Sequence, residues 1–411
     1  MTCVVASSDG AVLVLSPARS SLTVIARHER LVTTIAAVLT ASALTAHAHA
    51  QAAPSEWHLA ATPLWEAGMT SEDSAGSLAR PAGLVRLASG VVVVADQQNL
   101  NLRYYTPEGR LQGVAGRRGG GPGEFQSIKA VRECASDSAF VYDPALNRIS
   151  IFSSDGRFAR AIDLRREAGR AAPPYDVFCH RVGTLVAVNR SPAPPAGKGP
   201  RRPVVELTRL HLGGVPQSLG MLPGPERYFD GSQDIPRPLG RSTFVAVGAR
   251  ETFVATGDYL DASARFVLRR IPHAATRADS LVLAGTRVGV SRAHRATYVA
   301  EYLAPRVRSP QYGYLRRLYE EMEYPREFPS VGALWMSSSN NLWVGDYPIP
   351  GGAMVSYRVV AGVDSGARMA VPRSFELLDV VKDVAIGIWR DELDAATVRA
   401  YRIERGRSGA R

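Results

Sequence analysis

The chain has 411 residues, of which 45% are hydrophobic and 21% are charged, and its formal net charge is +11. This composition is typical of a globular protein with a real core and argues against a disordered chain. The 37 glycines and 27 prolines favour short strands and turns over long helices. Only Lys129, Lys198 and Lys382 are lysine, and the arginines are spread along the whole chain, so the charge does not by itself indicate a polyanion-binding surface.

Residues 1–50 predict an N-terminal extension with a secretory signal peptide. A basic segment at 27–30 precedes an apolar stretch at 31–46, which is too short and too rich in alanine and threonine for a good membrane span. An A-x-A cleavage pattern follows at 48–50, so the mature chain is expected to begin near Gln51, in the periplasm or outside the cell. No cysteine follows the apolar stretch, so a lipid anchor is not indicated. The leader is unusually long, and a wrongly assigned start codon is the simplest explanation.

Two segments of the mature chain repeat each other. Residues 91–111 and 138–158 align without a gap, and Asp143 lies 47 residues after Asp96. Each unit reads as an apolar strand ending in aspartate, a polar loop, an alternating strand, a four-residue turn (TPEG or SSDG) and another strand. Weaker copies contribute strands at 184–189, 204–212, 252–258, 264–271, 341–346, 353–360, 385–391 and 397–403.

Repeats of about 40 to 50 residues with four short strands each predict an all-β fold, a six-bladed β-propeller. The last unit lacks its outer strand, and the strand expected at 57–68 is free to supply it. Residues 51–411 are therefore expected to form a single domain in which the N-terminal strand closes the last blade and removes an exposed edge.

The repeat has a family resemblance. Residues 81–96 follow the pattern P-x-G-x-x-x-x-x-x-G-x-x-x-V-A-D, and GRLQGVAGRRGGGPGEF follows at 109–125. This sequence resembles the NHL-repeat type of six-bladed propeller. The resemblance implies the fold and leaves the activity open, because proteins of this fold include binding scaffolds, lactonase-like hydrolases and lyases.

The segment GRRGGGPGEF, at residues 116–125, resembles a phosphate-binding loop in composition only. A P-loop requires Gly-Lys followed by Ser or Thr, whereas Gly123 is followed by Glu124 and Phe125. We expect the glycines to carry the chain from the outer strand of one blade to the inner strand of the next, with Phe125 as an apolar anchor.

The long insertions are predicted to lie on one face of the ring. Residues 189–203 and 347–352 follow second strands of their blades, and residues 222–239 and 285–330 join successive blades. All four begin at the same end of the strands, and short turns occupy the opposite end. Binding residues commonly lie on such loops, so this face is expected to be the functional one.

The insertion 285–330, between blades four and five, carries two helical patterns. They cover residues 291–303 and 314–324, and the first opens on Ser291, a good N-cap. This short helical insertion is expected either to cap a central funnel or to pack on the rim as a spacer.

In five of the units an aspartate follows the second strand, and its carboxylate is expected mainly to accept hydrogen bonds from the backbone N–H groups of its own loop. These aspartates are Asp96, Asp143, Asp258, Asp346 and Asp391. Asp346 with Tyr347, and Arg390 with Asp391, are the pairs for which a ligand contact is most favoured. Arginine suits carboxylate or phosphate groups. The candidate ligand-binding residues on the insertion-bearing face are Arg201, Arg202, Asp258, Arg316, Arg317, Asp346, Tyr347, Arg390 and Asp391.

No catalytic constellation is recognisable. The histidines after residue 50 form no ligand pair at short spacing, and neither a G-x-S-x-G elbow nor a Cys–His arrangement is evident. The favoured function is an exported, non-catalytic, monomeric propeller without a cofactor, which binds a peptide, a protein or a surface polymer. Neither nucleic-acid binding nor a membrane span after signal cleavage is expected. The alternative is a lactonase-like hydrolase that uses Asp258, Asp346 and Asp391 with a divalent cation such as calcium.

Cys134 and Cys179 occupy equivalent places in adjacent blades, near the ends of inner strands on the plain face. Export favours a disulfide between them. The distance between equivalent points on neighbouring strands leaves the bond open, because a disulfide needs Cα atoms within about 7 Å.

Overall fold

A computed structural model describes residues 4–6, 12–14, 55–68, 77–134, 137–168, 172–181, 184–190, 197–274, 277–392 and 394–406. The chain divides into two units, Met1–Ala53 and Pro54–Arg411. In the first unit, β1 (Val4–Ala6) pairs antiparallel with β2 (Val12–Val14). The expected signal segment and its cleavage site lie outside the described residues. No helix within the described ranges is long and apolar enough to cross a membrane.

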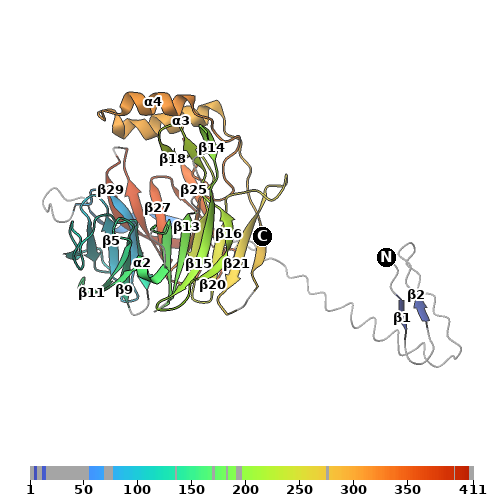
Figure 1. Cartoon of the computed structure of the whole chain (residues 1–411), viewed down its shortest axis with the longest axis horizontal. Helices are drawn as coiled ribbons and strands as arrows, with labels where there is room; N and C mark the ends of the chain where they lie inside the picture. Colours follow the sequence, from blue (N-terminus) through green and yellow to red (C-terminus); the bar gives the residue numbers. More distant parts are fainter. Residues whose placement is uncertain are drawn as a thin grey trace. The chain divides into compact units, whose positions relative to one another are not determined.

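The second unit is built from antiparallel sheets, four of which have four strands each. In each of these sheets the first strand along the chain is an edge strand, and the second strand is apolar and almost completely buried. An example is β5 (Figure 1), with the sequence VVVAD. The four sheets consist of β4 (Pro81–Arg86), β5 (Val92–Asp96), β6 (Asn101–Tyr105) and β7 (Leu111–Ala115); β8 (Ala130–Cys134), β9 (Ser138–Asp143), β10 (Arg148–Ser153) and β11 (Phe158–Asp163); β12 (Asp176–Arg181), β13 (Thr184–Arg190), β15 (Val204–His211) and β16 (Gln217–Pro223); and β19 (Phe244–Val247), β20 (Glu251–Ala255), β21 (Arg265–Pro272) and β22 (Asp279–Ala284).

The N-terminal strand β3 (Glu56–Ala67) joins the strands that follow residue 330 into one eight-stranded sheet. It runs antiparallel to β29 over most of its length and pairs in parallel with β26 at its first residues. The expected pairing of the N-terminal strand with the last strand of the chain is therefore confirmed. The order in this sheet is β23 (Ala333–Met336), β24 (Leu342–Gly345), β25 (Met354–Ala361), β26 (Arg368–Pro372), β3, β29 (Ala396–Arg405), β28 (Val384–Arg390) and β27 (Phe375–Val381).

The first strands of successive sheets contact one another and form a ring. β4 contacts β8, β8 contacts β12, β12 contacts β19, β19 contacts β23, and β27 contacts β4. β23 and β27 are the two edge strands of the eight-stranded sheet, which completes the ring. Each sheet therefore extends outward from a central axis. Sheets arranged in this way make a β-propeller, as the repeat pattern predicts.

The glycine-rich segment carries the chain from β7 to β8. Phe125 is completely buried, and a Cβ on Gly116, whose φ is +80°, would lie 2.5 Å from its ring. Arg148 donates to the carbonyl oxygens of Gly120, Gly121 and Glu124, which holds the segment in place. The expected crossing with an apolar anchor is confirmed.

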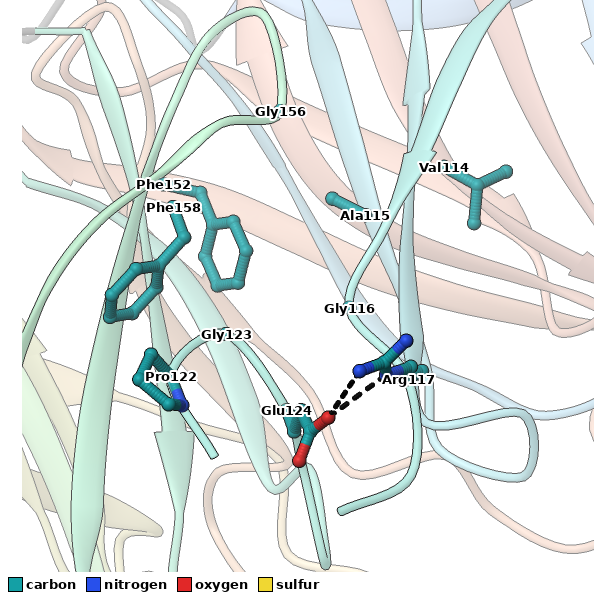
Figure 2. A pocket seen from close by; sticks show the side chains of 10 residues that line it. All are labelled: Val114, Ala115, Gly116, Arg117, Pro122, Gly123, Glu124, Phe152, Gly156 and Phe158. Carbon is teal, nitrogen blue, oxygen red and sulfur yellow. Dashed lines mark hydrogen bonds and ion pairs between the residues drawn. The ribbon is translucent and has the colours of Figure 1, made fainter. Parts of the chain in front are cut away.

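A shallow depression of about 290 Å³ lies beside this crossing (Figure 2). Arg117 donates to Glu124 across it, with the Arg117 Nη2 to Glu124 Oε1 distance at 2.8 Å. Phe152, Phe158 and Pro122 form its apolar side (Figure 2). The cation that a phosphate would need is thus already paired with a carboxylate.

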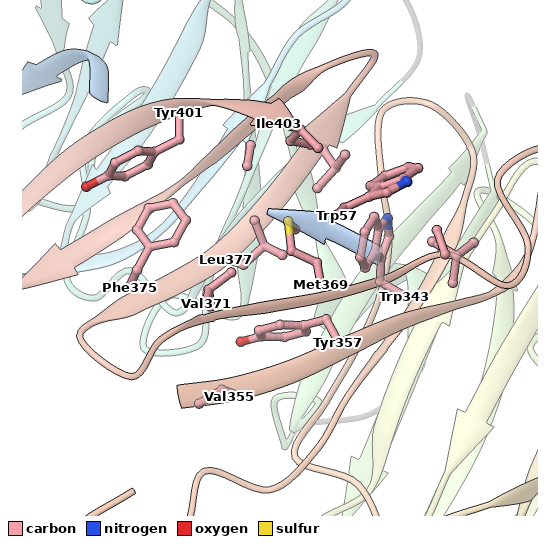
Figure 3. Close-up of a cluster of buried hydrophobic side chains, with 14 residues drawn as sticks. Trp57, Trp343, Val355, Tyr357, Met369, Val371, Phe375, Leu377, Tyr401 and Ile403 are labelled. Atoms are coloured by element: carbon pink, nitrogen blue, oxygen red, sulfur yellow. The ribbon is translucent and has the colours of Figure 1, made fainter. Parts of the chain in front are cut away.

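The cluster of buried side chains around β3 joins the two halves of the eight-stranded sheet (Figure 3). Trp57 is 2% exposed and meets Trp343 edge to face, with the ring centroids 5.9 Å apart. Tyr357, Met369 and Ile403 belong to the same cluster. Trp57 and Trp343 therefore belong to the buried core of this sheet.

A disulfide joins Cys134 of β8 to Cys179 of β12, with the two Cα atoms 5.6 Å apart. This distance lies within the range that a disulfide requires. Cys134 pairs with Ser138 at the short-turn end of the sheet, away from the insertions. The disulfide, whose presence the sequence did not decide, is therefore formed, and it links the inner strands of two neighbouring sheets.

Short elements outside the main sheets gather at one end of the molecule (Figure 1). α3 begins after the N-cap Ser291, whose hydroxyl accepts from the backbone N–H of His294, so the expected helix start is confirmed. α4 begins two residues before its predicted start. These elements are α3 (Arg292–Leu303), η1 (Ala304–Arg306), α4 (Tyr312–Glu321), β14 (Gly199–Arg201), β17 (Arg227–Phe229) and β18 (Asp234–Pro236); α2 (Leu164–Ala168) follows β11 elsewhere.

Candidate functional site

The four long insertions begin at the same end of their sheets, which we call the insertion-bearing face. β13 ends where β15 begins, with Arg190 opposite Val205, and β16 ends there too, with Pro223 opposite Val204. β22 likewise ends beside the start of β21. The short turns lie at the other end, which we call the plain face.

Three of the four insertions share one hydrophobic core, and β14 of the fourth pairs with β17, so the insertions form a single cap. β17, β18 and the segment after them pack against the helical segment, and residues that follow β24 pack on the same core. The buried members are Tyr228, Leu239, Val290, Met322, Tyr324 and Phe328, and Ile235, Tyr298, Leu318, Tyr347 and Ile349 are among those that pack against them.

Polar contacts fix the cap to its surroundings. Glu301 of α3 accepts two hydrogen bonds from Arg373, at 2.6 and 2.7 Å, and Arg373 lies between β26 and β27. Tyr314 of α4 donates to Asp230, which lies between β17 and β18. The two helices are therefore tied to different parts of the insertion-bearing face.

Three of the predicted ligand contacts pair within the protein. Arg202 and Asp258 form an ion pair with an N–O distance of 2.6 Å, and Arg201 pairs with Asp234 at 2.8 Å. Asp258 lies three residues after the end of β20, so it does not occupy the register of Asp96 and Asp143. The Arg202–Asp258 pair links the cap to the sheet that begins with β19, and the Arg201–Asp234 pair joins β14 to β18 within the cap.

The remaining predicted arginines lie in other surroundings. Arg316 and Arg317 are exposed on α4, and Arg316 pairs with Glu320 one turn along the same helix. Arg390, at the end of β28, donates to the carbonyl oxygen of Pro81 at 3.4 Å. Asp391 accepts from the backbone N–H of Ala395 at 2.8 Å. The nine predicted residues thus occupy several places on one face.

Asp96 has the structural role that its position predicts. Its completely buried carboxylate accepts from the backbone N–H groups of Ala79, Arg80, Gln98 and Asn99 and from the Asn99 side-chain amide, at 2.9 to 3.2 Å. Burial raises the pKa of Asp96, but these donors outweigh it and leave the pKa below its usual value. Asp143 makes an equivalent set of bonds.

Asp346, which follows β24, differs from these two aspartates. Its carboxylate accepts no hydrogen bond from any described residue. Burial raises the pKa of Asp346, and the more distant charges of Arg358 and Arg368 only partly oppose this effect. Its neighbour Tyr347 packs against Phe328 in the cap core, and burial raises the pKa of Tyr347 to about 12.

Replacing Asp96 and Asp346 by asparagine is expected to change stability in opposite directions at pH 7. Asp96→Asn removes a charge that five N–H groups stabilise, so the free energy of unfolding should fall by about 1–3 kcal/mol. Asp346→Asn removes a charge that burial disfavours, so the free energy of unfolding should rise. Urea unfolding of the two variants and the wild type measures both changes.

The pH dependence of these two effects follows from the pKa directions. The folded state holds the Asp346 proton more tightly than the unfolded chain, so the ionisation of Asp346 lowers the stability as the pH rises above about 4. The gain from Asp346→Asn should therefore be absent at pH 3 and appear towards pH 7. The cost of Asp96→Asn should shrink as the pH falls, because the lowered pKa of Asp96 stabilises the fold only while the group is ionised. A loss of stability in Asp346→Asn at pH 7 contradicts this account.

Glu376 is a second carboxyl of raised pKa at the insertion-bearing end, and sequence reasoning missed it. It is the second residue of β27, at the insertion-bearing end of that strand. Burial raises its pKa, and the charge of Arg390 opposes the effect. The signal in the sequence was an acidic residue within the apolar stretch FELLDVV. The structure assigns raised pKa values to Asp346 and Glu376, the kind of perturbation that acid–base groups need.

A cation–aromatic cluster of five residues, also missed from the sequence, lies where β8 and β12 begin and β13 ends. The Lys129 Nζ lies 3.6 Å from the centroid of the Tyr175 ring, and the Arg190 Cζ lies 4.8 Å from the same centroid. Arg132 donates to Asp176 at 2.9 Å. We call these residues the Tyr175 cluster. The overlooked signal was Lys129, one of only three lysines, directly before an inner strand.

Among the described residues, no group of three or more His, Cys, Asp or Glu side chains is placed to hold a metal ion.

No family model matches the sequence, and no curated protein matches it. Solved structures that the fold resembles include a Bacteroides fragilis protein described as exported (12% identity, 85% of this chain and 99% of that one, TM-score 0.44). They also include a virginiamycin B lyase from Staphylococcus aureus (10% identity, 82% of this chain and 98% of that one, TM-score 0.40). A third is a calcium-binding regucalcin from Agrobacterium tumefaciens (10% identity, 84% of this chain and 96% of that one, TM-score 0.39). Likenesses this distant carry no information about activity, and the propeller assignment depends on the strand pairing described above.

Proposed function

We propose that the protein is an exported, non-catalytic, six-bladed propeller of the NHL type that binds a peptide, protein or surface polymer on its insertion-bearing face. In this proposal the eight-stranded sheet is two blades joined by β3, and α3 and α4 form an insertion between blades four and five. The chain acts as a monomer and needs no cofactor.

The observation that carries the proposal is the shared core of the cap. Insertions that served only as spacers would have no reason to pack on one another, whereas Tyr228, Phe328 and Tyr347 come from three separate insertions and bury one common surface. The Glu301–Arg373 and Tyr314–Asp230 contacts add fixed attachment points. A pre-formed surface of this kind reduces the ordering cost of binding.

Export is supported by the disulfide between Cys134 and Cys179. Disulfides persist in oxidising compartments and are rare in the cytosol. The proposal predicts that the native protein begins near Gln51. N-terminal sequencing of the protein from its source cell tests this, and a mature protein that retains the preceding residues would exclude export through this signal.

The binding face can be tested by blocking each face in turn. Glu392→Cys places a thiol on an exposed residue of the insertion-bearing face, and Glu108→Cys places one in a plain-face turn, with the same change of charge. Each is coupled to a 5-kDa polyethylene glycol with the native disulfide intact. Peptides selected from a random phage-displayed library on the unmodified chain should lose binding to the first conjugate and keep binding to the second. The reverse pattern, or a library that yields no saturable binder, contradicts the proposal.

The alternative, a hydrolase with funnel carboxylates and a divalent cation, is favoured by one observation: the half-buried carboxyl of Asp346 accepts no hydrogen bond from a described residue. Elemental analysis of the dialysed protein and a screen with lactone substrates distinguish the two functions. A stoichiometric ion, together with turnover that Asp346→Asn abolishes while peptide binding remains, would establish the hydrolase in place of the binding protein.

A further inference from the structure

We propose that the Tyr175 cluster is the part of the insertion-bearing face that receives a carboxylate side chain of an acidic peptide. This inference rests on the proposed binding function and names the chemistry of its ligand. The cations that would contact the carboxylate are Lys129 and Arg190.

The position of the cluster follows from the strand register. Ala130, the first residue of β8, lies opposite Tyr142 near the end of β9, so Lys129 is at the insertion-bearing end. The backbone N–H of Tyr175 donates to the carbonyl oxygen of Val188, which places Tyr175 beside the end of β13. Arg190 is the last residue of that strand. The three side chains therefore meet at one end of two neighbouring sheets, near the ring of inner strands.

The charges of the cluster do not balance. The carboxylate of Asp176 accepts from Arg132 at 2.9 Å and from the backbone N–H of Val177 at 2.8 Å, so these two charges offset each other. The side chains of Lys129 and Arg190 lie over the Tyr175 ring, and neither side chain makes a hydrogen bond or ion pair with a described residue. Two cations thus remain without an anionic partner.

This imbalance contrasts with five arginines of the cap. Arg201, Arg202, Arg227, Arg237 and Arg241 each lie within 4 Å of a carboxylate oxygen of the protein. Protein carboxylates therefore occupy donors of these five arginines, whereas no carboxylate of the described residues is ion-paired with Lys129 or Arg190. Burial lowers the pKa of Lys129, with Asp176 opposing and Arg190 adding to the effect, so a bound anion would stabilise its charged form.

The geometry favours isolated carboxylates over a dense polyanion. Arg190 offers a planar fork that suits a carboxylate, and Lys129 offers a compact ammonium. Asp176 lies in the same cluster and would repel a second anion placed beside the first. A peptide can present one or two carboxylates separated by uncharged residues, whereas a polyuronate or polyphosphate carries a charge on every unit.

The test uses two blocked pentapeptides, GEGEG and its uncharged counterpart GQGQG, titrated with the mature chain at low ionic strength and followed by NMR of the peptide. We expect GEGEG to bind and GQGQG not to bind. The double variant Lys129→Met/Arg190→Gln should lose about ten-fold or more in affinity, because hydrogen bonds to charged groups are the strong ones. Lys129→Arg, which keeps the charge, should keep most of the affinity.

The matched control is Arg110→Gln/Arg157→Gln, which removes the same charge from exposed plain-face turns and should leave binding unchanged. Equal binding of the two peptides, no binding of GEGEG at millimolar concentration, or full affinity in Lys129→Met/Arg190→Gln would overturn the proposal. If polygalacturonate binds more tightly per carboxylate than GEGEG does, the proposal is overturned, and a dense polyanion is the ligand instead. If GEGEG fails while library peptides still bind and are blocked by the Glu392 conjugate, only this inference fails and the binding function stands.

Discussion

Replacement of Trp57 by alanine is expected to lower the free energy of unfolding by about 3–5 kcal/mol, the cost of removing a large, fully buried aromatic side chain. Trp57 is 2% exposed and packs edge to face on Trp343. The Arg405 Cζ lies 4.4 Å from the centroid of its ring. Its backbone lies where β3 pairs with both β26 and β29, so the loss of the ring weakens both joints of the eight-stranded sheet.

Leu64→Ala is the matched control for this prediction, because Leu64 lies on the same strand and is 48% exposed. Its effect should stay within about 0.5 kcal/mol, as for most surface substitutions. Urea unfolding followed by tryptophan fluorescence and by circular dichroism gives both values. If Trp57→Ala lowers the free energy of unfolding no more than Leu64→Ala does, the prediction fails, and β3 stabilises the sheet through its backbone alone.

Removal of the disulfide is expected to cost about 2–4 kcal/mol, through the loss of a constraint on the unfolded chain. Cys134 and Cys179 are separated by 45 residues and connect the inner strands of neighbouring sheets. In Cys134→Ala/Cys179→Ala this loop can open fully on unfolding, so the unfolded state gains entropy. Thermal and urea unfolding of the variant and the oxidised wild type measure the difference.

A reductant distinguishes the loss of the bond from a packing defect. Dithiothreitol should lower the stability of the wild type to about that of Cys134→Ala/Cys179→Ala and should leave the variant unchanged. A wild type whose stability does not respond to reduction, although its thiols become titratable, would contradict a stabilising disulfide.

Much of the fold follows from the sequence because the strand repeat is local. The offset between Asp96 and Asp143 fixed the repeating unit, and buried strands such as β5 and β9 carry continuous apolar runs that define the second position of each sheet. The closure by β3 also followed, since an incomplete last unit and a spare N-terminal strand are both visible in the chain. The parallel contact of β3 with β26 was not foreseen, because the pairing of a strand on both of its edges depends on tertiary packing.

The candidate site was less accessible to sequence reasoning. The prediction that the long insertions begin at one end of the sheets was confirmed, but Arg202 and Asp258 pair with each other across 56 residues. Lys129, Tyr175 and Arg190 come from separate segments, and only the strand register brings them together. The equivalence of the aspartates also concealed a difference, because Asp96 has five donors around its carboxylate and Asp346 has none among the described residues.

The most direct test of binding on the insertion-bearing face is amide hydrogen exchange of the mature chain with and without a saturating library-selected peptide. The account predicts slower exchange in the segments 126–132, 174–178 and 186–190, which carry the Tyr175 cluster, and no change in the plain-face turns 106–110 and 153–157. Protection confined to the plain-face turns, or to the outer depression beside Arg117, would contradict it.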